Sequence, residues 1–257
     1  MGKGFALVTG ASSGIGADIA RVLAAEGYPL ILVARRSERL EALRSELACV
    51  EVVVIQHDLS ALHAAEDLVA KVGGRPIEIL VNNAGVGMQG QFLDMDLARV
   101  EEMCRLNITT LTALTQLVAR QMVAAGHGYI LQVASSAAFL PSPQVSAYAA
   151  TKAYVLSFSE ALGFELRGSG VSVTTLYPGI TTTEFNTTAS ARTPPLMNLS
   201  ILTPAVVAKA GVRAMFLRKR AVVPGLINKL SAFFAGILHR GLVLTLAGQL
   251  LKRANAR

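Results

Sequence analysis

Hydrophobic and polar positions along the chain follow two different periods. Short apolar runs, which suit buried strands, alternate with stretches in which apolar residues recur every three to four positions, as in amphipathic helices. The predicted strands are Phe5–Thr9, Leu30–Val33, Val52–Gln56, Ile77–Val81, Tyr129–Val133 and Val171–Leu176. The predicted helices are about Ile15–Gly27, Glu38–Leu47, Ala61–Val72, a long helix opened by Asp96, and about Ala147–Arg167. Strands that are apolar throughout are typical of parallel sheets with helices on both faces, so we predict a doubly wound α/β fold.

Proline-containing loops follow or flank the predicted strand ends at Pro141/Pro143, Pro178-Gly179 and Pro194-Pro195. Sheets of this kind bind ligands at the carboxyl edge, where such loops gather. The alternation of predicted strands and helices favours a single domain over residues 1–224, followed by an extension over 225–257.

The composition excludes several classes of protein. With 52% hydrophobic and 16% charged residues, the chain is not intrinsically disordered. The two cysteines lie far apart and the four histidines form no ligand motif, so we expect no disulfide framework and no metal. The apolar stretch Phe5–Val8 is too short for a secretion signal, and we expect a cytoplasmic protein.

Charge is distributed unevenly along the chain. Residues 1–184 hold 13 of the 24 Lys and Arg residues and all 17 acids, whereas 185–257 hold the other 11 basic residues and no acid. Such an asymmetry suggests a partner for the C-terminal part. Nucleic acid is disfavoured as that partner because the basic segment is otherwise apolar and has no interleaved Tyr or Trp.

A glycine-rich loop joins the first predicted strand to the first helix. It runs Thr9-Gly10-Ala11-Ser12-Ser13-Gly14-Ile15-Gly16. Backbone amides at a helix N-terminus can face a pyrophosphate, and glycine lets the phosphate approach. A simple turn is the alternative interpretation of the glycine spacing alone.

A tyrosine and a lysine are placed for acid–base chemistry on one predicted helix. Tyr148 and Lys152 are four residues apart and therefore share a face. A nearby cation favours phenolate, so we expect Lys152 to lower the pKa of Tyr148 from its usual value of about 10. An ordinary surface pair is the alternative, but Ser135, 13 residues earlier at a strand end, argues against it.

Taken in order, these motifs resemble the short-chain dehydrogenase/reductase family. The chain carries TGxxxGxG, then Asn82-Asn83-Ala84-Gly85, Asn107, Ser135, Tyr148-Ala149-Ala150-Thr151-Lys152 and Pro178-Gly179. The resemblance covers about residues 4–190. It implies a Rossmann-like fold, a nicotinamide cofactor and interconversion of a carbonyl and an alcohol.

The resemblance also implies a role for particular residues. Ser135 would hydrogen-bond the substrate carbonyl, Tyr148 would deliver the proton, Lys152 would also hold the nicotinamide ribose, and Asn107 would orient a water that relays protons. The residues expected to bind the cofactor are Gly10, Ser12, Ser13, Gly14, Ile15, Gly16, Arg35, Arg36, Asp58, Asn83, Ala84, Gly85, Tyr148, Lys152, Pro178, Gly179, Thr181 and Thr183.

Two of these assignments leave a local alternative open. Arg35 and Arg36 follow the second strand, where guanidinium groups suit the 2′-phosphate of NADP(H), although they could be a solvated charge run heading a helix. Asp58 would bond the adenine by resemblance, yet it could equally cap the helix that follows. We predict NADP(H) as the cofactor.

The expected substrate is a lipophilic carbonyl or alcohol, such as a ketoacyl or steroid-like compound. Apolar loop residues near the expected site come from separate segments, namely Met88, Phe92, Phe139, Leu140, Val145, Phe185, Leu196 and Met197. Packing of loops against the core would need the same residues. The alternative function is a dinucleotide-binding, membrane-surface interaction or regulatory protein without turnover.

Residues 225–257 show the period of two amphipathic helices with wide leucine-rich faces. A spanning helix is disfavoured because His239-Arg240 interrupts the apolar stretch. We expect the segment to dock on an apolar surface: the protein core, another subunit of a homodimer or homotetramer, or the inner face of a membrane.

Overall fold

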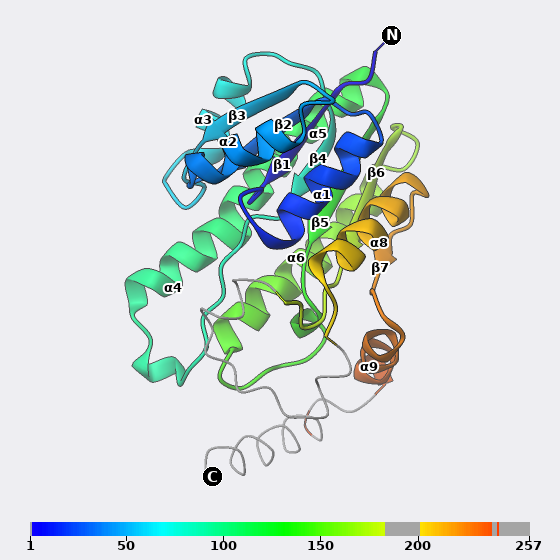
Figure 1. Cartoon of the computed structure of the whole chain (residues 1–257). Coiled ribbons are helices and arrows are strands. Elements are labelled where there is room, and N and C mark those ends of the chain that lie inside the picture. The colour runs from blue at the N-terminus through cyan, green and yellow to red at the C-terminus, as the bar shows by residue number, and fades with distance from the viewer. Residues whose placement is uncertain (1, 183–200, 238–240, 242–257) are drawn as a thin grey trace.

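The computed structural model describes residues 2–182, 201–237 and 241. Seven parallel strands form one sheet in the order β3-β2-β1-β4-β5-β6-β7 (Figure 1). The strands are β1 (Phe5–Thr9), β2 (Leu30–Ala34), β3 (Val52–Gln56), β4 (Ile77–Asn82), β5 (Gly128–Val133), β6 (Val171–Leu176) and β7 (Ala221–Val222). The predicted doubly wound parallel sheet is confirmed.

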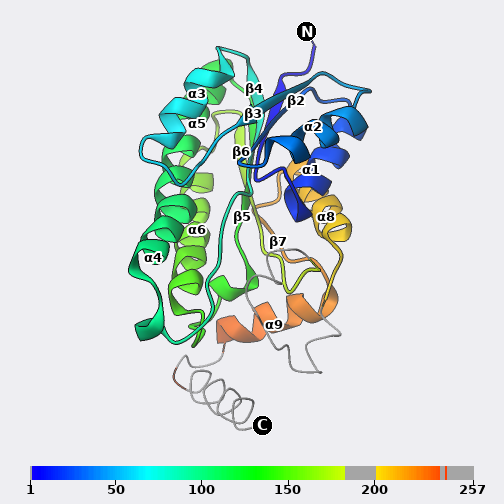
Figure 2. The ribbon, with the colours of Figure 1, turned by 60° about the vertical axis from the view of Figure 1, so that its left-hand side comes forward.

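Helices cover both faces of the sheet. They are α1 (Gly14–Ala25), α2 (Ser37–Glu46), α3 (Ala64–Val72), α4 (Leu97–Cys104), α5 (Leu111–Ala125), α6 (Ser146–Glu165), α8 (Pro204–Phe216) and α9 (Leu226–Ile237). Figure 2 shows α1, α2 and α8 on one face and α3, α4, α5 and α6 on the other. The described residues also contain three short turns: η1 (Phe92–Asp94), the π-helical η2 (Arg105–Thr110) and η3 (Ser136–Ala138).

Each face of the sheet has its own apolar core. In β1, Ala6 and Val8 belong to the cluster under α1 and α8, whereas Leu7 belongs to the cluster under α3 and α5. Because successive side chains of a strand point to opposite faces, nearly every position of a central strand is buried, and all five of β2 are. This is why β1 and β2 are almost entirely apolar instead of alternating.

The strand order reverses between β1 and β4. Here the two strands pair directly, with Val8 opposite Val81, so the loops that leave them start side by side. Loops that leave such neighbouring strands toward opposite faces open a crevice at the carboxyl edge, which is where α/β sheets bind ligands.

The helix predicted from Ala61 begins later, at Ala64. The Asp58 carboxylate accepts hydrogen bonds from the Ser60 backbone amide (2.9 Å) and hydroxyl (2.7 Å). These bonds stabilise the turn before α3 and not the N-terminus of α3. His63 then adopts a left-handed conformation with φ of 56°. Asp58 therefore caps a local turn and not α3 itself.

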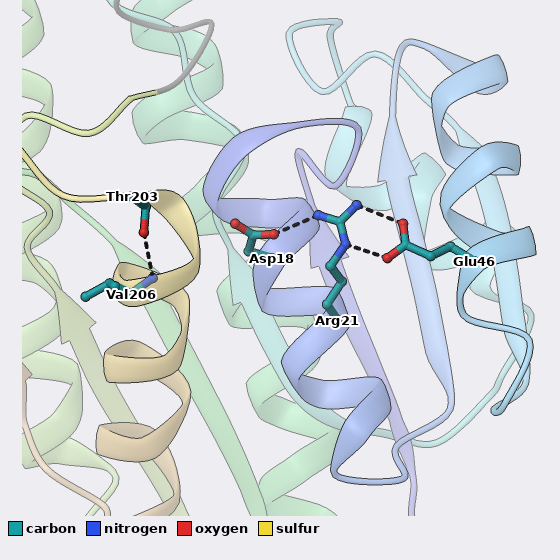
Figure 3. A network of polar contacts seen from close by, with 5 residues as sticks. All are labelled: Asp18, Arg21, Glu46, Thr203 and Val206. Atoms are coloured by element: carbon teal, nitrogen blue, oxygen red, sulfur yellow. Dashed lines mark hydrogen bonds and ion pairs between the residues drawn. The ribbon is translucent and has the colours of Figure 1, made fainter.

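The sequence interpretation missed α8 and β7. The signal for α8 was present, because Thr203 precedes Pro204, and Pro at the first helical position is a common helix start. Thr203 Oγ1 accepts a hydrogen bond from the Val206 amide at 3.5 Å (Figure 3). β7 has two residues, too few for any periodic signal.

Arg21 fixes α1 to α2 on the outer surface. Its Nε and Nη2 atoms donate to the two carboxylate oxygens of Glu46 at 2.7 and 2.8 Å, and Nη1 donates to Asp18 at 2.7 Å (Figure 3). Since α1 begins at the glycine-rich loop, this bidentate pair helps to hold the helix that presents the loop.

Candidate active site

Tyr148 and Lys152 lie one turn apart near the start of α6. Lys152 is 5% exposed, and its Nζ lies 5.9 Å from the centre of the Tyr148 ring. Nζ donates a 3.0 Å hydrogen bond to the carbonyl oxygen of Val133, the last residue of β5. The lysine is therefore held against the carboxyl edge of the sheet, and the surface-pair alternative does not describe it.

Ser135 joins the tyrosine from the end of β5. It follows β5 and starts η3, where its Oγ accepts the Ala137 amide at 3.1 Å. The Ser136 amide donates to the Pro178 carbonyl at 2.8 Å, which ties this turn to the loop after β6. A hydrogen bond also joins the Ser135 and Tyr148 side chains.

Burial controls the protonation of both titratable groups in this cluster. It raises the pKa of Tyr148 to about 12, although the hydrogen bond with Ser135 acts to lower it. It lowers the pKa of Lys152 to about 8. The expectation that Lys152 lowers the tyrosine pKa is thus wrong for the protein without ligands, because removing the groups from water disfavours both charged forms.

Asn107 joins three elements from the π-helical turn η2. Its side chain is completely buried; Oδ1 accepts the Val86 amide (3.1 Å) and Nδ2 donates to the Val86 carbonyl (2.9 Å). Nδ2 also donates to Thr151 Oγ1 at 3.0 Å. Since Thr151 precedes Lys152, Asn107 fixes the loop after β4 to the part of α6 that carries Tyr148 and Lys152.

Gly85 lies where these groups converge. A Cβ atom on this residue would stand 3.2 Å from Asn107 Oδ1 and 3.4 Å from Lys152 Nζ. The glycine therefore leaves open the approach from the loop after β4 to the lysine.

The glycine-rich loop packs directly on the start of the Asn83-Ala84 segment. Gly10 and Gly14 have φ of 65° and 57°, a conformation that favours glycine. A Cβ on Gly10 would lie 2.8 Å from Asn83 Nδ2, and one on Gly16 would collide with the same amide and the Gly10 carbonyl. Asn83 Nδ2 in turn donates to the Thr9 carbonyl at 2.9 Å.

The start of α1 offers backbone donors to an anion. Ser13 is the residue before α1. In the part of the chain that the structure describes, its hydroxyl accepts no hydrogen bond from the backbone amides of the helix. It accepts a 2.9 Å hydrogen bond from Arg36 Nη2 instead. The first amides of a helix have no acceptor within it, so this cradle fits the pyrophosphate of a dinucleotide.

The two arginines after β2 point in different directions. Arg36 Nη2 lies over the glycine-rich loop, 3.2 Å from Ser12 Oγ as well as close to Ser13. Arg35 Nη1 instead lies 3.5 Å from Glu102 Oε1 on α4, and both of these side chains are exposed. A positive group thus stands beside the phosphate cradle, which fits a 2′-phosphate better than a free ribose hydroxyl.

Asp58 lies at the end of β3, next to this charged region. Burial acts to raise its pKa, but the two hydrogen bonds from Ser60 and the charge of Arg35 lower it overall. The carboxylate is therefore ionised near neutral pH and able to accept a hydrogen bond from an adenine amino group.

The loop after β6 is only partly described. Thr181 is buried, pairs with Leu202 and donates from Oγ1 to the Gly179 carbonyl at 3.1 Å. Thr183 lies outside the described residues, as do Phe185, Leu196 and Met197 of the expected substrate pocket.

The remaining pocket residues come from two loops that are joined to each other. The Gly90 amide donates to the Gln144 carbonyl at 2.8 Å, linking the loop that carries Met88 to the one that carries Leu140 and Val145. Phe139 stacks against Tyr177 with ring centres 4.8 Å apart, so it contributes to packing as well.

Several residues that support the site were not identified from the sequence. Thr9 Oγ1 accepts the amides of Asn83 and Ala84, each at 3.0 Å, and the Val133 carbonyl holds Lys152. Thr9 could have been noticed as the first residue of the glycine-rich motif. A backbone carbonyl leaves no signal in the sequence.

Two further findings concern the described residues as a whole. No three His, Cys, Asp or Glu residues among them gather as metal ligands would. None of their helices has both the length and the apolar character needed to cross a bilayer.

Comparison with known proteins agrees with this geometry. The family model described as short chain dehydrogenase matches residues 4–194. A short-chain type dehydrogenase/reductase of Sinorhizobium fredii is 38% identical over 185 residues, which cover 72% of each chain. The human very-long-chain 3-oxoacyl-CoA reductase is 33% identical over 223 residues, covering 84% of this chain and 70% of that protein.

A solved structure agrees along almost the whole chain. The short-chain dehydrogenase from Sphingobium yanoikuyae in complex with NADPH is 33% identical, with a TM-score of 0.80, and the match covers 93% of this chain and 95% of that one. The order of the motifs, the seven-stranded sheet and these matches lead to one conclusion: the chain belongs to the short-chain dehydrogenase/reductase family.

Proposed function

We propose that this protein is an NADP(H)-dependent oxidoreductase that interconverts a carbonyl and a secondary alcohol on a lipophilic substrate. The observation that carries the proposal is the cluster at the carboxyl edge, in which Ser135, Tyr148 and Lys152 are held by the ends of β5 and the start of α6. The NADPH complex of the Sphingobium relative and the name of the human reductase support the cofactor and the substrate class.

The cofactor would lie across the point where the strand order reverses. The amides of Gly14, Ile15 and Gly16 would bind the pyrophosphate, and Arg36 with Ser12 and Ser13 would bind the 2′-phosphate. Arg35 and Asp58 would face the adenosine part, while Asn83, Ala84 and Gly85 would line its middle. Pro178, Gly179, Thr181 and Thr183 would contact the nicotinamide end.

Tyr148 would act as the acid in the direction of reduction. When bound, NADPH supplies a hydride to the carbonyl carbon. The Tyr148 hydroxyl gives its proton to the carbonyl oxygen, which Ser135 has positioned, so that the product is a neutral alcohol. A pKa of about 12 keeps this hydroxyl protonated until it is needed.

Lys152 and Asn107 would restore the proton on Tyr148. A lysine with a pKa near 8 can both carry and release a proton near neutral pH. Both Nδ2 protons of Asn107 are donated to protein acceptors, so a relaying water would be bound by Oδ1, on the side that faces Gly85 and Lys152.

The substrate pocket would lie between the two loops that Gly90 and Gln144 join. Met88, Leu140 and Val145 are half-buried there and Phe92 is exposed at the margin. Apolar side chains in a pocket favour an apolar substrate body, with the few polar groups reserved for the reacting carbonyl.

We further propose that the protein is cytoplasmic, forms a homodimer or homotetramer, and is held peripherally at a membrane face through residues 225–257. Exposed apolar side chains on α5 and α6, including Val123, Tyr154 and Phe164, provide a surface for subunit contact. The basic excess of the C-terminal part supports the membrane contact.

The test is NADPH oxidation with a graded series of ketones and ketoacyl thioesters. We expect kcat/KM to increase with the length of the apolar part, and Tyr148→Phe to remove turnover while NADPH still binds. A preference for small polar sugars would contradict the substrate class. NADPH binding without turnover on any carbonyl would instead identify a dinucleotide-binding regulator.

A further inference from the structure

Helix α9 turns a polar residue toward the protein and apolar residues toward solvent. Asn228 is 7% exposed, whereas Leu226 is 73% and Phe233 63% exposed. At 100° per residue, Leu226, Ile227, Leu230, Phe233 and Phe234 fall on one side of the helix and Asn228 falls on the opposite side. This orientation is the reverse of the usual one for a surface helix, so the apolar face is available to a partner.

Helix α9 packs on the loop after β6. Asn228 Nδ2 donates to the Pro224 carbonyl at 3.0 Å, and a Cβ on Gly179 would lie 2.6 Å from both Nδ2 and Oδ1 of Asn228. The helix thus rests on the segment proposed to contact the nicotinamide. In Figures 1 and 2, α9 lies beyond the carboxyl ends of the strands, at the end of the molecule where the candidate active site is.

The charge of this part of the chain indicates what kind of partner binds the apolar face of α9. The 32 residues from the start of α9 onward carry five basic residues and no acid, and on α9 itself Lys229 is exposed beside the apolar face. A symmetric contact with a second copy would bring two basic segments together, because such an interface uses the same patch twice. An anionic bilayer offers the opposite charge together with an apolar phase.

The pattern of side chains on α9 favours a helix that lies in the interface. Its twelve described residues extend about 18 Å along the axis, with the exposed Lys229 next to the apolar face. Phe233 and Phe234 are in edge contact, with ring centres 5.8 Å apart, and form a broad apolar end on the exposed face. Such a helix buries its apolar side at the boundary of headgroups and acyl chains.

We propose that α9 docks on an anionic bilayer through Leu226, Ile227, Leu230, Phe233 and Phe234, and thereby turns the carboxyl edge of the sheet toward the membrane. A lipophilic carbonyl can then enter the site directly from the lipid phase. The docking deepens the membrane contact proposed above for residues 225–257 and is argued from the geometry of α9, whereas the entry of substrate rests on the proposed reductase function.

The test is flotation of the full-length protein with vesicles of phosphatidylcholine alone and with added phosphatidylglycerol. The α9 variant is Leu230→Ser with Phe233→Ser, and its matched control is Leu62→Ser with Leu217→Ser. Leu62 and Leu217 are 70% and 56% exposed and belong neither to α9 nor to the α5 and α6 surface proposed for subunit contact. Circular dichroism establishes that each variant is folded.

We expect the wild type and the control to bind the anionic vesicles within twofold of each other, and the α9 variant to bind at least tenfold more weakly. Binding should decrease in high salt and on neutral vesicles, since charge contributes to it. Equal binding by the α9 variant would overturn the proposal. The proposal would also be overturned if the wild type did not bind vesicles and an oligomer dissociated only in the α9 variant. The apolar face would then be a contact with a second copy of the chain.

Activity separates this proposal from the proposed function. With a short water-soluble ketone, the α9 variant should match the wild type, whereas with a long-chain ketone embedded in anionic vesicles its rate should fall at least fivefold. Vesicle binding without NADPH oxidation by any variant would refute the reductase function and leave the docking intact. Equal rates on the embedded ketone would refute substrate entry from the lipid phase.

Discussion

Asn107 donates a 3.0 Å hydrogen bond from its side-chain amide to Thr151 Oγ1, and this bond joins the π-helical turn η2 to the part of α6 that carries Tyr148 and Lys152. Thr151 Oγ1 also donates to the Tyr148 carbonyl at 2.7 Å. Because Thr151 is buried, neither bond can be replaced by water.

Thr151→Val should therefore destabilise the protein by about 1–3 kcal/mol, since it leaves a buried amide donor without this acceptor. For a chain of this size, that corresponds to a decrease in Tm of roughly 2–12 °C. Thermal unfolding provides the measurement. Thr112→Val, which removes an exposed bond to Tyr154, is the control and should have little effect; equal losses in the two variants would contradict the structural role of Thr151.

Tyr148→Phe should lower kcat by about 10²–10⁴-fold, the usual contribution of a positioned acid. The variant keeps the ring and loses only the hydroxyl, so the Kd for NADPH should change by less than about threefold. Steady-state kinetics and fluorescence titration separate the two quantities. Retention of more than about a tenth of the wild-type kcat would show that another group delivers the proton.

Lys152→Met should change how stability depends on pH. The folded pKa of about 8 lies below the unfolded value of 10.5, so the unfolded chain binds more protons between these two values. The free energy of unfolding of the wild type minus that of Lys152→Met should therefore increase between pH 7.5 and pH 10, by on the order of 2 kcal/mol. Urea unfolding at both values measures this, with the exposed Lys209→Met as a control that should follow the wild type.

Arg36→Ala should weaken NADPH binding by about 10–100-fold, because a charge-assisted hydrogen bond contributes roughly 1.5–3 kcal/mol. NADH has no 2′-phosphate, and its Kd should change by less than about threefold. Isothermal titration with both cofactors makes the comparison. Arg44→Ala on the outer part of α2, where Arg44 pairs with Glu41, serves as the control, and an equal loss for NADPH and NADH would place Arg36 outside the phosphate site.

Glu102→Gln should tighten NADPH binding two- to fivefold at low ionic strength. Its carboxylate lies 3.5 Å from Arg35, next to the proposed adenosine end of the cofactor site, where its negative charge would repel the 2′-phosphate bound by Arg36. Exposed ion pairs contribute little free energy, so the change in the Kd for NADPH should be small and should vanish in high salt. Glu101→Gln removes the neighbouring charge as a control, and weaker NADPH binding in Glu102→Gln would show that Glu102 instead orients Arg35.

The sequence by itself determined the layered fold and the identity of the central groups. Periodicity alone predicts the strands and most helices, since a strand buried on both faces must be apolar throughout, as Leu30–Ala34 is. The glycine-rich loop, Ser135, Tyr148 and Lys152 were visible because each belongs to a local pattern of residue types and spacings.

Only the tertiary structure decided how those groups behave. The spacing of Tyr148 and Lys152 predicts attraction between their charges, yet burial dominates, because desolvation depends on every element packed around a group. The Val133 carbonyl that holds Lys152 and the Glu102 carboxylate beside Arg35 come from distant segments. Likewise, the period of α9 predicts an apolar face, but which side of the helix meets the protein depends on the contact of Asn228 with Gly179, which no local pattern of residues encodes.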